Sequence, residues 1–378
     1  MMQSSFKHSA LFAALALALA GNALAQEQVV KIGQTGPLSG PNAFAGKDNE
    51  NGVRLAIEEL NAKKLQAAGK TLKFELQSED DQCDPKSGVA VAQKLVDSGV
   101  KYVMGPYCSG VAIPASRVYD EGGTLMSTVG TNPKVTAGGF KNVFRIIAGD
   151  NQIGSSMAMY AAKVMKAKTA AVIDDRTAFG QGVAIEFMKE AKAQGLTVVG
   201  QEYTTDKATD FSAILTTIKS KKPDVIFFGG YAPQAAPMAR QMKQLAISAK
   251  MLGGDTLCSP EMGKLGGDAV NDVVYCAQGG SMLDKTSEGP AFKAKYKKRF
   301  NLDADAYAAS FYDQALLLGQ SMAKAGSTDP VKVAAELRKG SYKGVAGTYA
   351  YDDMGNMKQA PITVYTFKNA QATPLASY

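Results

Sequence analysis

The chain has 378 residues, of which 46% are hydrophobic and 20% are charged, and its formal net charge at pH 7 is +7. This length exceeds what one hydrophobic core usually supports, so we expect two domains. The basic residues are scattered over the expected helices, and the densest run, KAKYKKRF at 293–300, is typical of a solvated helix face, with weak docking to an acidic partner as the alternative. The charge therefore does not indicate a nucleic-acid partner.

Residues 1–25 have the pattern of a secretory signal peptide. Lys7 and His8 precede an apolar Ala/Leu run, and an Ala-Leu-Ala segment offers a cleavage site after Ala25. The apolar run is too short to span a bilayer, and no later stretch approaches the roughly 20 apolar residues of a transmembrane helix. We expect an exported, periplasmic mature chain of 378 − 25 = 353 residues.

The composition of the expected mature chain limits its chemistry. His8 is the only histidine, so histidine-dependent catalysis and imidazole metal ligation are excluded once the signal is removed. An even number of cysteines in an oxidising compartment favours two disulfides, and three pairings fit the sequence. A metal site is the alternative, but the cysteine spacings lack a C-x2-C clip, so we expect neither metal nor cofactor. The cysteines are Cys83, Cys108, Cys258 and Cys276.

Short β-rich segments alternate with helical patterns over the first part of the chain. Apolar residues recur at helical spacing from Val53 to Leu60, and Asp84 followed by Pro85 predicts the start of a second helix that Gly99 ends. This alternation is typical of a parallel α/β sheet. Strands are predicted at 29–35, 72–80, 101–106, 124–128 and 143–147.

A second series of the same kind begins after Asp150. Two such series predict an α/β fold of two doubly wound parallel-sheet lobes, with a crevice between the carboxyl ends of their strands. Three strand-free helical patterns at 289–300, 305–326 and 329–340 then suggest that the chain returns to the first lobe after about residue 279, and β-hairpin material around 352–356 suggests that it finishes on the second. The strands of the second series are predicted at 169–175, 196–204, 224–230, 250–255 and 273–279.

Polar residues follow two predicted strands of the first series, where the crevice would lie. The segment GPYCSG at 105–110 leads into a helix, so Ser109 is expected either to cap that helix or to bind a carboxylate together with the free helix amides. Gly130 and Thr131 follow the next strand, where Gly130 permits close backbone approach. An ordinary turn before Pro133 is the alternative for this second segment.

Two aromatic residues and an acid follow three predicted strands of the second series. Phe179, Tyr231 and Asp255 each come just after a strand end, although aromatic loop residues are often core plugs and an acid after glycines is often a helix cap. Across a crevice from Ser109, the three together would suit a zwitterionic amino acid, with its carboxylate at the helix end, its ammonium at Asp255 and its apolar side chain against the rings.

Five segments of the sequence carry a family resemblance: GPLSGPNAFAGKDNENG, DDQCDPKSGVAVAQKLV, VKYVMGPYCSG, FGQG and FFGGY. They closely resemble the periplasmic branched-chain amino-acid binding proteins of ABC importers, the leucine/isoleucine/valine class. The resemblance implies a type I periplasmic-binding-protein fold, whose two lobes are joined by three crossovers, close on the ligand and dock to a membrane permease. We expect lobe 1 to comprise residues 26–148 and 279–351, and lobe 2 residues 149–278 and 352–378.

The resemblance assigns roles by position. It pairs Cys83 with Cys108 and makes Ser109 the carboxylate-binding serine, while Thr131, with Gly130 beside it, matches a threonine that contacts both ends of the zwitterion. Asp255 stands where the family usually has a glutamate, so its shorter side chain is expected to reach the ammonium either directly or through a bridging water.

The resemblance also implies a side-chain pocket and a second disulfide. Phe179 stands where a tyrosine is common and Tyr231 matches the family, while Tyr107 replaces a smaller apolar residue. Cys258 and Cys276 resemble an additional disulfide that not every member has. The other pocket residues implied are Tyr307, which aligns with a lining aromatic, and Phe44 and Ala45, near which the family often has a tyrosine.

Together these features predict a monomer that passively captures a branched-chain or related aliphatic amino acid and delivers it to a permease. The sequence speaks against an enzyme because it lacks a G-x-G-x-x-G turn, a P-loop and a G-x-S-x-G elbow. A ligand-sensing receptor domain, which would normally carry a transmembrane helix or a DNA-binding module, is a second alternative. A third keeps the importer role with an amide, urea or aromatic acid as cargo, and the acid at Asp255 speaks against it.

Overall fold

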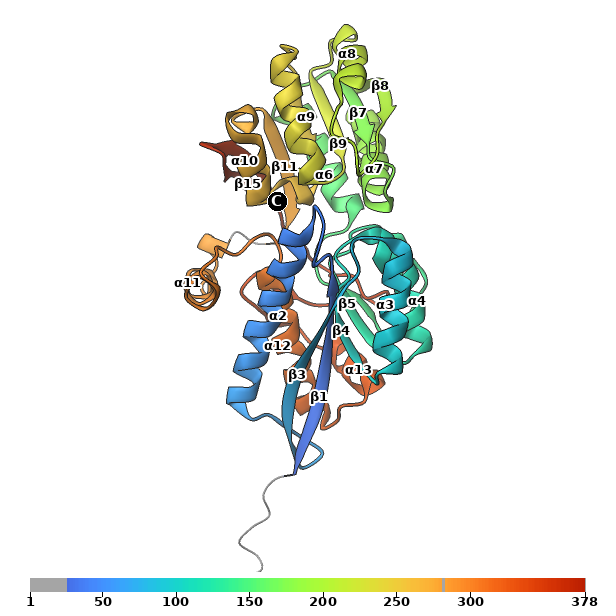
Figure 1. Ribbon diagram of the computed structural model, residues 1–378, viewed down its shortest axis with the longest axis vertical. Helices are drawn as coiled ribbons and strands as arrows, with labels where there is room; N and C mark the ends of the chain where they lie inside the picture. The colour runs from blue at the N-terminus through green and yellow to red at the C-terminus, as the bar shows by residue number, and fades with distance from the viewer. Residues whose placement is uncertain (1–25, 281–282, 378) are drawn as a thin grey trace, which may run out of the picture.

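The computed structural model describes residues 26–280 and 283–377, so the predicted signal peptide and its cleavage after Ala25 lie outside the described residues. The strands form two large sheets, which build two lobes stacked along the long axis of the molecule (Figure 1). The chain passes between the two sheets three times, after β6, after β11 and before β14. The predicted α/β class with two lobes joined by three crossovers is confirmed.

The first sheet has the strand order β2-β3-β1-β4-β5-β6. All its strands run parallel except the short edge strand β2, which is antiparallel to β3. Because β1 lies between β3 and β4, the strand order reverses there, and such a point opens a crevice at the carboxyl ends of the strands. The strands are β1 (Glu27–Gly36), β2 (Gln66–Ala67), β3 (Lys70–Asp80), β4 (Tyr102–Met104), β5 (Leu125–Thr128) and β6 (Val143–Arg145).

The second sheet has the order β15-β14-β11-β10-β9-β7-β8. Its first five strands in sequence are parallel, and β9, with the sequence VIFFG, is buried at every residue, as expected for a parallel strand covered on both faces. The last two strands are antiparallel and extend one edge. The strands are β7 (Thr169–Asp174), β8 (Thr197–Tyr203), β9 (Val225–Gly229), β10 (Lys250–Gly253), β11 (Val274–Gly279), β14 (Ile362–Lys368) and β15 (Gln371–Ser377).

Helices cover both faces of the first sheet. On one face α2 packs against α12, and α13 and α11 join them; on the other face α3 packs against α4. Gly52 of α2 lies against the backbone of Ala308, where a Cβ atom would overlap the carbonyl group, so a glycine is needed for the two helices to approach this closely. The helices are α2 (Ala43–Lys63), α3 (Pro85–Asp97), α4 (Ser109–Glu121), α5 (Lys134–Ala137), α11 (Gly289–Phe300), α12 (Ala308–Ala325) and α13 (Pro330–Lys339).

The second sheet is covered by α6 and α7 on one face and by α8, α9 and α10 on the other. A hydrophobic cluster runs from α2 and α12 across the crevice to α6 and α7, so the two lobes share buried surface. The elements are α6 (Asp150–Lys163), α7 (Ala178–Ala193), α8 (Ser212–Ser220), α9 (Ala232–Gln244), α10 (Pro260–Gly266), the 3-10 turns η1 (Asp255–Leu257), η2 (Gly267–Val270) and η3 (Leu283–Lys285), and the small ribbon β12 (Tyr342–Lys343) with β13 (Thr348–Tyr349).

Each strand and helix predicted from the sequence has a counterpart, with one correction near the C-terminus. The final hairpin, β14 with β15, turns at Asn369 and Ala370, both of which have positive φ. The predicted turn at 352–356 is instead a separate small turn that a single bridge closes. The hairpin nevertheless joins the second sheet, as expected, while the exact lobe boundaries stay a prediction.

All four cysteines form disulfides, in the sequential pairing. Cys83 bonds to Cys108 across 25 residues, and Cys258 bonds to Cys276 across 18. The first bond joins the segment before α3 to the start of α4, and the second joins the end of η1 to β11. In the part of the chain that the structure describes, no helix is long and apolar enough to cross a membrane.

Candidate functional site

The carboxyl ends of the two sheets face each other. Asn132, in the loop after β5, donates a hydrogen bond from Nδ2 to the carbonyl oxygen of Ala178, at the start of α7, over 2.7 Å. The rings of Tyr107, after β4, and Tyr231, after β9, lie with their centroids 6.2 Å apart. The loops predicted to form a crevice are therefore in contact across it.

The side chain of Ser109 forms a hydrogen bond with the neighbouring loop and not with its own helix. It begins α4 but makes no capping hydrogen bond, so a role as a helix cap is not found. Its Oγ accepts a hydrogen bond from the backbone N–H of Asn132 over 3.2 Å, and the residue is 2% exposed. A hydroxyl that accepts here can still donate its own hydrogen, as binding a carboxylate would require.

A buried arginine binds the loop that carries Gly130 and Thr131 through hydrogen bonds. Arg145, at the end of β6, donates from Nη1 to the carbonyl oxygens of Thr131 and Asn132, over 2.8 and 2.9 Å. A Cβ atom at Gly130 would lie 2.8 Å from the Cβ of Ala112, so the loop packs directly on α4. The Thr131 hydroxyl is buried and has no hydrogen-bond partner among the described residues, which leaves it available to a ligand.

Asp255 lies at the opposite side of the crevice, directly after β10. Its Oδ2 accepts a hydrogen bond from the hydroxyl of Tyr307, while Oδ1 has no partner within the described residues. Burial raises the pKa of this carboxyl to about 6, and the bond from Tyr307 opposes the rise. An acid that is 2% exposed and half-satisfied is a strong acceptor for a cation.

Four aromatic rings fill the space between these polar groups. The Tyr107 centroid lies 6.2 Å from that of Tyr231 and 6.4 Å from that of Tyr307, and Tyr231 is 5.3 Å from Phe179. Their tilted arrangements are those that aromatic pairs favour. Burial raises the pKa of the Tyr107, Tyr231 and Tyr307 hydroxyls well above the usual tyrosine value, so these side chains remain neutral.

The remaining predicted site residues, Phe44 and Ala45, line a small cavity beside these rings. The cavity holds only about 10 Å³, about the least that one water molecule requires. This part of the crevice is thus nearly filled by its own side chains, and a ligand could occupy it only if the rings turned or the lobes parted. The cavity is lined by Phe44, Ala45, Asp48, Asn49, Tyr107, Asp255, Thr256, Ser259, Asp305, Ala306 and Tyr307.

Two further acids, which the sequence analysis did not single out, border the same cavity: Asp48 is buried and Asp305 is half-buried. Asp48 of α2 accepts hydrogen bonds from the amides of Asp305 and Ala308, over 2.9 and 3.0 Å, and so fixes the start of α12. Asp305 accepts a bond from the Ser259 hydroxyl over 2.8 Å, from the loop after η1. Burial raises the pKa of Asp48 to about 6 and that of Asp305 to about 7, with repulsion from Asp48 adding to the latter.

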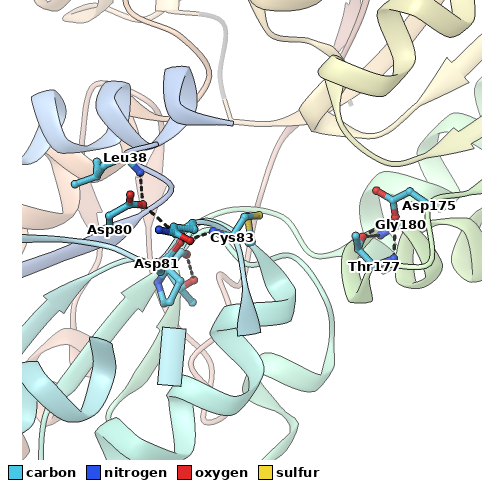
Figure 2. Close-up of a disulfide and its surroundings, with 11 residues drawn as sticks. Leu38, Asp80, Asp81, Cys83, Asp175, Thr177 and Gly180 are labelled. Carbon is cyan, nitrogen blue, oxygen red and sulfur yellow. Dashed lines mark hydrogen bonds between the residues drawn. A yellow bond between two sulfur atoms is a disulfide. The ribbon is translucent and has the colours of Figure 1, made fainter. Parts of the chain in front are cut away.

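The first disulfide braces the loop in front of Ser109. Figure 2 shows Asp81 beside Cys83, where its Oδ1 accepts a hydrogen bond from the Cys83 amide over 2.9 Å. Because Cys83 is bonded to Cys108, this carboxyl and the disulfide together fix the residue that precedes Ser109. The bond thus positions a candidate site residue as well as linking two segments.

Across the crevice, a second acid orders the start of α7 (Figure 2). Asp175 accepts hydrogen bonds from the amide and the hydroxyl of Thr177, over 2.9 and 2.7 Å. The Thr177 hydroxyl in turn caps the helix by accepting from the amide of Gly180 over 3.0 Å. This cap fixes the first turn of α7 and with it the ring of Phe179.

Larger hollows on the surface lie away from this crevice. One of about 720 Å³ is bordered by Pro223, Val225 and Ile247, at the amino ends of β9 and β10. In doubly wound sheets, ligands bind at the carboxyl ends of the strands, where loops lead into helix N-termini. The crevice is therefore the better candidate.

Comparison with known proteins gives a consistent result. A family model described as periplasmic binding protein matches residues 29–372. A Leu/Ile/Val-binding protein, BraC3, from Rhizobium johnstonii is 36% identical over 361 residues, which cover 95% of this chain and 96% of that protein. A leucine-, isoleucine-, valine-, threonine- and alanine-binding protein from Pseudomonas aeruginosa is 32% identical over 379 residues and covers 99% of each chain.

Solved structures give the same fold. The crystal structure of a leucine binding protein, LivK, from Thermotoga maritima superposes with a TM-score of 0.85. The two sequences are 27% identical, and the match covers 92% of this chain and 98% of that one.

Proposed function

Because the chain belongs to the family of periplasmic binding proteins, we propose that it captures a free branched-chain or related aliphatic amino acid between its lobes. It then delivers the amino acid to the membrane permease of an ABC importer. The names of the similar proteins, which bind leucine, isoleucine, valine and, in one case, threonine and alanine, support small aliphatic cargo. Capture is passive, since no bond is made or broken.

In this proposal the first lobe binds the carboxylate of the amino acid. The Ser109 hydroxyl and the free amides at the start of α4 donate to it, and the unpartnered Thr131 hydroxyl adds a third group. The second lobe binds the ammonium through Asp255, directly or through a water molecule. The aliphatic side chain packs among the rings of Tyr107, Phe179, Tyr231 and Tyr307, beside Phe44 and Ala45.

The observation that carries the proposal is the buried carboxylate of Asp255, which accepts a hydrogen bond from Tyr307 and has one oxygen without a partner among the described residues, beside the ring cluster of Tyr107, Tyr231 and Tyr307. Charge-assisted hydrogen bonds contribute about 1.5–3 kcal/mol each. Burying one aliphatic side chain contributes about 1.5–3 kcal/mol more. Two charged ends and one buried side chain are together enough for roughly micromolar binding.

We further propose that ligand binding favours the closed arrangement of the lobes. The contacts from Asn132 to Ala178 and from Ser259 to Asp305 link the two sides and support a closed form. Lobe 1 would then comprise 26–148 and 279–351, and lobe 2 the rest of the mature chain. The permease would recognise this closed form in the periplasm, after removal of a signal peptide that ends at Ala25.

Calorimetry tests the proposed function. Protein that has been unfolded, stripped of ligand and refolded is titrated with amino acids, uncharged amides and aromatic acids. We expect leucine, isoleucine or valine to bind at micromolar concentrations or below. If all three fail while an amide, urea or an aromatic acid binds tightly, the cargo is different; if nothing in the panel binds, a sensory or other role replaces transport.

The role of Asp255 has its own test. The Asp255→Asn variant keeps an acceptor for the Tyr307 hydroxyl but removes the charge, so it should weaken leucine binding by about 2 kcal/mol, or roughly 30-fold in Kd. Asp255→Ala should weaken it at least as much. Unchanged affinity in both variants would remove Asp255 from the site.

A further inference from the structure

Two of the three crossovers begin close together at the edge of the first sheet. The first crossover (146–149) follows Arg145, at the end of β6, and the third (359–361) follows the turn at 352–356, which ends at Asn356. A parallel β-bridge joins Arg145 to Asn356, and the Arg145 amide donates to the carbonyl oxygen of Gly355 over 2.8 Å. A Cβ atom at Gly355, where φ is +82°, would lie 2.0 Å from the Val143 carbonyl oxygen, so this turn packs directly on β6.

The guanidinium of Arg145 connects this turn to the loop after β5. Nη1 donates to the carbonyl oxygens of Thr131 and Asn132, over 2.8 and 2.9 Å. Nη2 donates to Oδ1 of Asn356 and, over 3.3 Å, to the hydroxyl of Thr136, which itself donates to Asn356 over 2.9 Å. Arg145 is 5% exposed, and a buried cation needs such partners. One side chain thus joins a loop of the crevice to the bases of two crossovers.

The charge of Arg145 is balanced from both sides of the first crossover. Burial lowers the pKa of the guanidinium, and the carboxylates of Asp150 and Asp352 oppose this change. Asp150 begins α6, beyond the crossover, whereas Asp352 lies in the turn and accepts from the Asn356 amide over 2.8 Å. Because the guanidinium is a planar fork that stays protonated, it holds its partners in one fixed arrangement.

The loop that Arg145 binds carries groups of the candidate site. Thr131 offers its hydroxyl there, and Asn132 bonds to Ser109 and, across the crevice, to Ala178. A displacement of this loop is therefore transmitted to Arg145, and through Arg145 to the bases of the first and third crossovers.

Farther along, the three crossovers contact one another. A Cβ atom at Gly279, the last residue of β11, would lie 2.7 Å from the Cβ of Ala148 in the first crossover. The amide of Gly280, in the second crossover, donates to the carbonyl oxygen of Pro361, in the third, over 2.8 Å. A movement imposed on one crossover is thus passed to the other two.

We propose that Arg145 is a positioning residue for lobe closure, which holds the loop after β5 and the bases of two crossovers as one rigid unit. This inference rests on the proposed function and deepens it, because it names the residue that couples the ligand-binding loop to the hinge. Closure bends the crossovers only beyond this unit, so a ligand bound at the loop favours one closed arrangement. Without the bond to Asn356 the third crossover moves independently of the loop, and ligand binding must order it as well.

Calorimetry and stopped-flow dissociation of leucine from the Asn356→Ala variant test this role. The substitution removes the bond from Arg145 to the turn and leaves its bonds to the Thr131 and Asn132 carbonyl oxygens. We expect the Kd for leucine to rise about threefold to thirtyfold, the range for loss of a coupling contact. The rise should lie in faster dissociation, because a looser hinge opens more readily while the open lobes still admit the ligand.

A second substitution shows whether the effect acts through Arg145. Arg145→Lys keeps the positive charge but cannot reach the loop and the turn together, because an ammonium lacks the planar fork. In the Arg145→Lys background, Asn356→Ala should therefore add little to the rise in Kd.

The matched control is Asn61→Ala. Asn61 of α2 is half-buried, as Asn356 is, and its side chain makes two hydrogen bonds with the backbone of Phe74, over 2.9 and 2.8 Å, within the first lobe. This variant should lower the melting temperature and keep the wild-type Kd and dissociation rate, as expected for a residue with only a structural role.

Three results would overturn the proposal: an unchanged Kd or dissociation rate in Asn356→Ala, an equal rise in Kd in Asn61→Ala, or full additivity of Asn356→Ala and Arg145→Lys. Should Arg145→Lys show no cooperative unfolding transition, the comparison of the two asparagine variants decides. These outcomes differ from failure of the proposed function, in which wild-type protein itself binds none of the three aliphatic amino acids.

Discussion

The bond from Asn132 to Ala178 allows closure of the lobes to be perturbed separately from folding. In Asn132→Asp, one carboxylate oxygen can still accept from the amide of Lys134, as Oδ1 of the asparagine does over 3.0 Å. The other carboxylate oxygen replaces Nδ2, which in the wild-type protein donates to the Ala178 carbonyl oxygen over 2.7 Å. In the variant, two acceptor oxygens therefore face each other. The closed form therefore loses a hydrogen bond and gains a repulsive contact, whereas the open form hydrates the new charge.

The magnitude follows from these two effects. Loss of the bond removes about 1 kcal/mol, and burying an unpaired polar group adds about 1–3 kcal/mol. We expect the Kd for leucine to rise at least about 30-fold, because about 1.4 kcal/mol corresponds to a factor of ten. Calorimetry measures this Kd, and thermal unfolding of the ligand-free protein should change little.

Asn142→Asp is the matched control for this prediction. Nδ2 of Asn142 donates to the carbonyl oxygens of Tyr119 and Thr124, over 3.3 and 2.6 Å, entirely within the first lobe. This variant should lower the melting temperature and leave the Kd unchanged. A wild-type Kd in Asn132→Asp, or the same loss of stability and affinity in both variants, would refute the reasoning about closure.

Three further predictions concern stability. The buried carboxyls, led by Asp150 with a pKa of about 8, hold their protons more tightly in the folded than in the unfolded chain. Their stabilising contribution is therefore complete below about pH 4 and is lost as the pH rises toward 8. A melting temperature of the ligand-free protein that rises between pH 4 and pH 8 would contradict this prediction. The double variant Cys258→Ser with Cys276→Ser opens a loop of 18 residues and should cost about 3 kcal/mol in urea denaturation; equal stability would mean that the bond adds nothing. Gly52→Ala should destabilise by about 1–3 kcal/mol, because its Cβ would overlap the Ala308 carbonyl group, and a gain in stability would show that the two helices can separate without cost.

The succession of strands and helices could be predicted because its signals are local. Asp84 does cap α3, where its side chain accepts from the amide of Ser87, and Gly99 after that helix has the positive φ of a stop signal. The turn near the C-terminus was misplaced because two segments carry turn residues. Pairing of β14 with β11, not the local sequence, decides where the final hairpin forms.

The framework of the site was predicted less completely than the fold. From the sequence Ser109 could be either a helix cap or a site residue, and the hydrogen bond that its Oγ accepts from the amide of Asn132, in another loop, could not be predicted from the local sequence. Asp48 fixes Ala308, which is 260 residues away in the sequence. Arg145 could have been singled out from the sequence, because an arginine at the end of a predicted buried strand needs hydrogen-bond partners there. The spacing of Asp150 in the sequence does not predict its electrostatic interaction with Asp255, because the pairing of strands in the second sheet brings the two residues near each other.

Both halves of the molecule depend on residues from the last part of the chain. The first sheet is covered by α12 (Ala308–Ala325), and the second sheet is extended by β14 (Ile362–Lys368), which pairs with β11. A ribosome makes the N-terminal residues first, so a growing chain has neither half complete until almost all of it exists. Contacts of such long sequence separation also form slowly. The order of synthesis itself therefore keeps both halves of a newly made chain unfinished until translation is almost over.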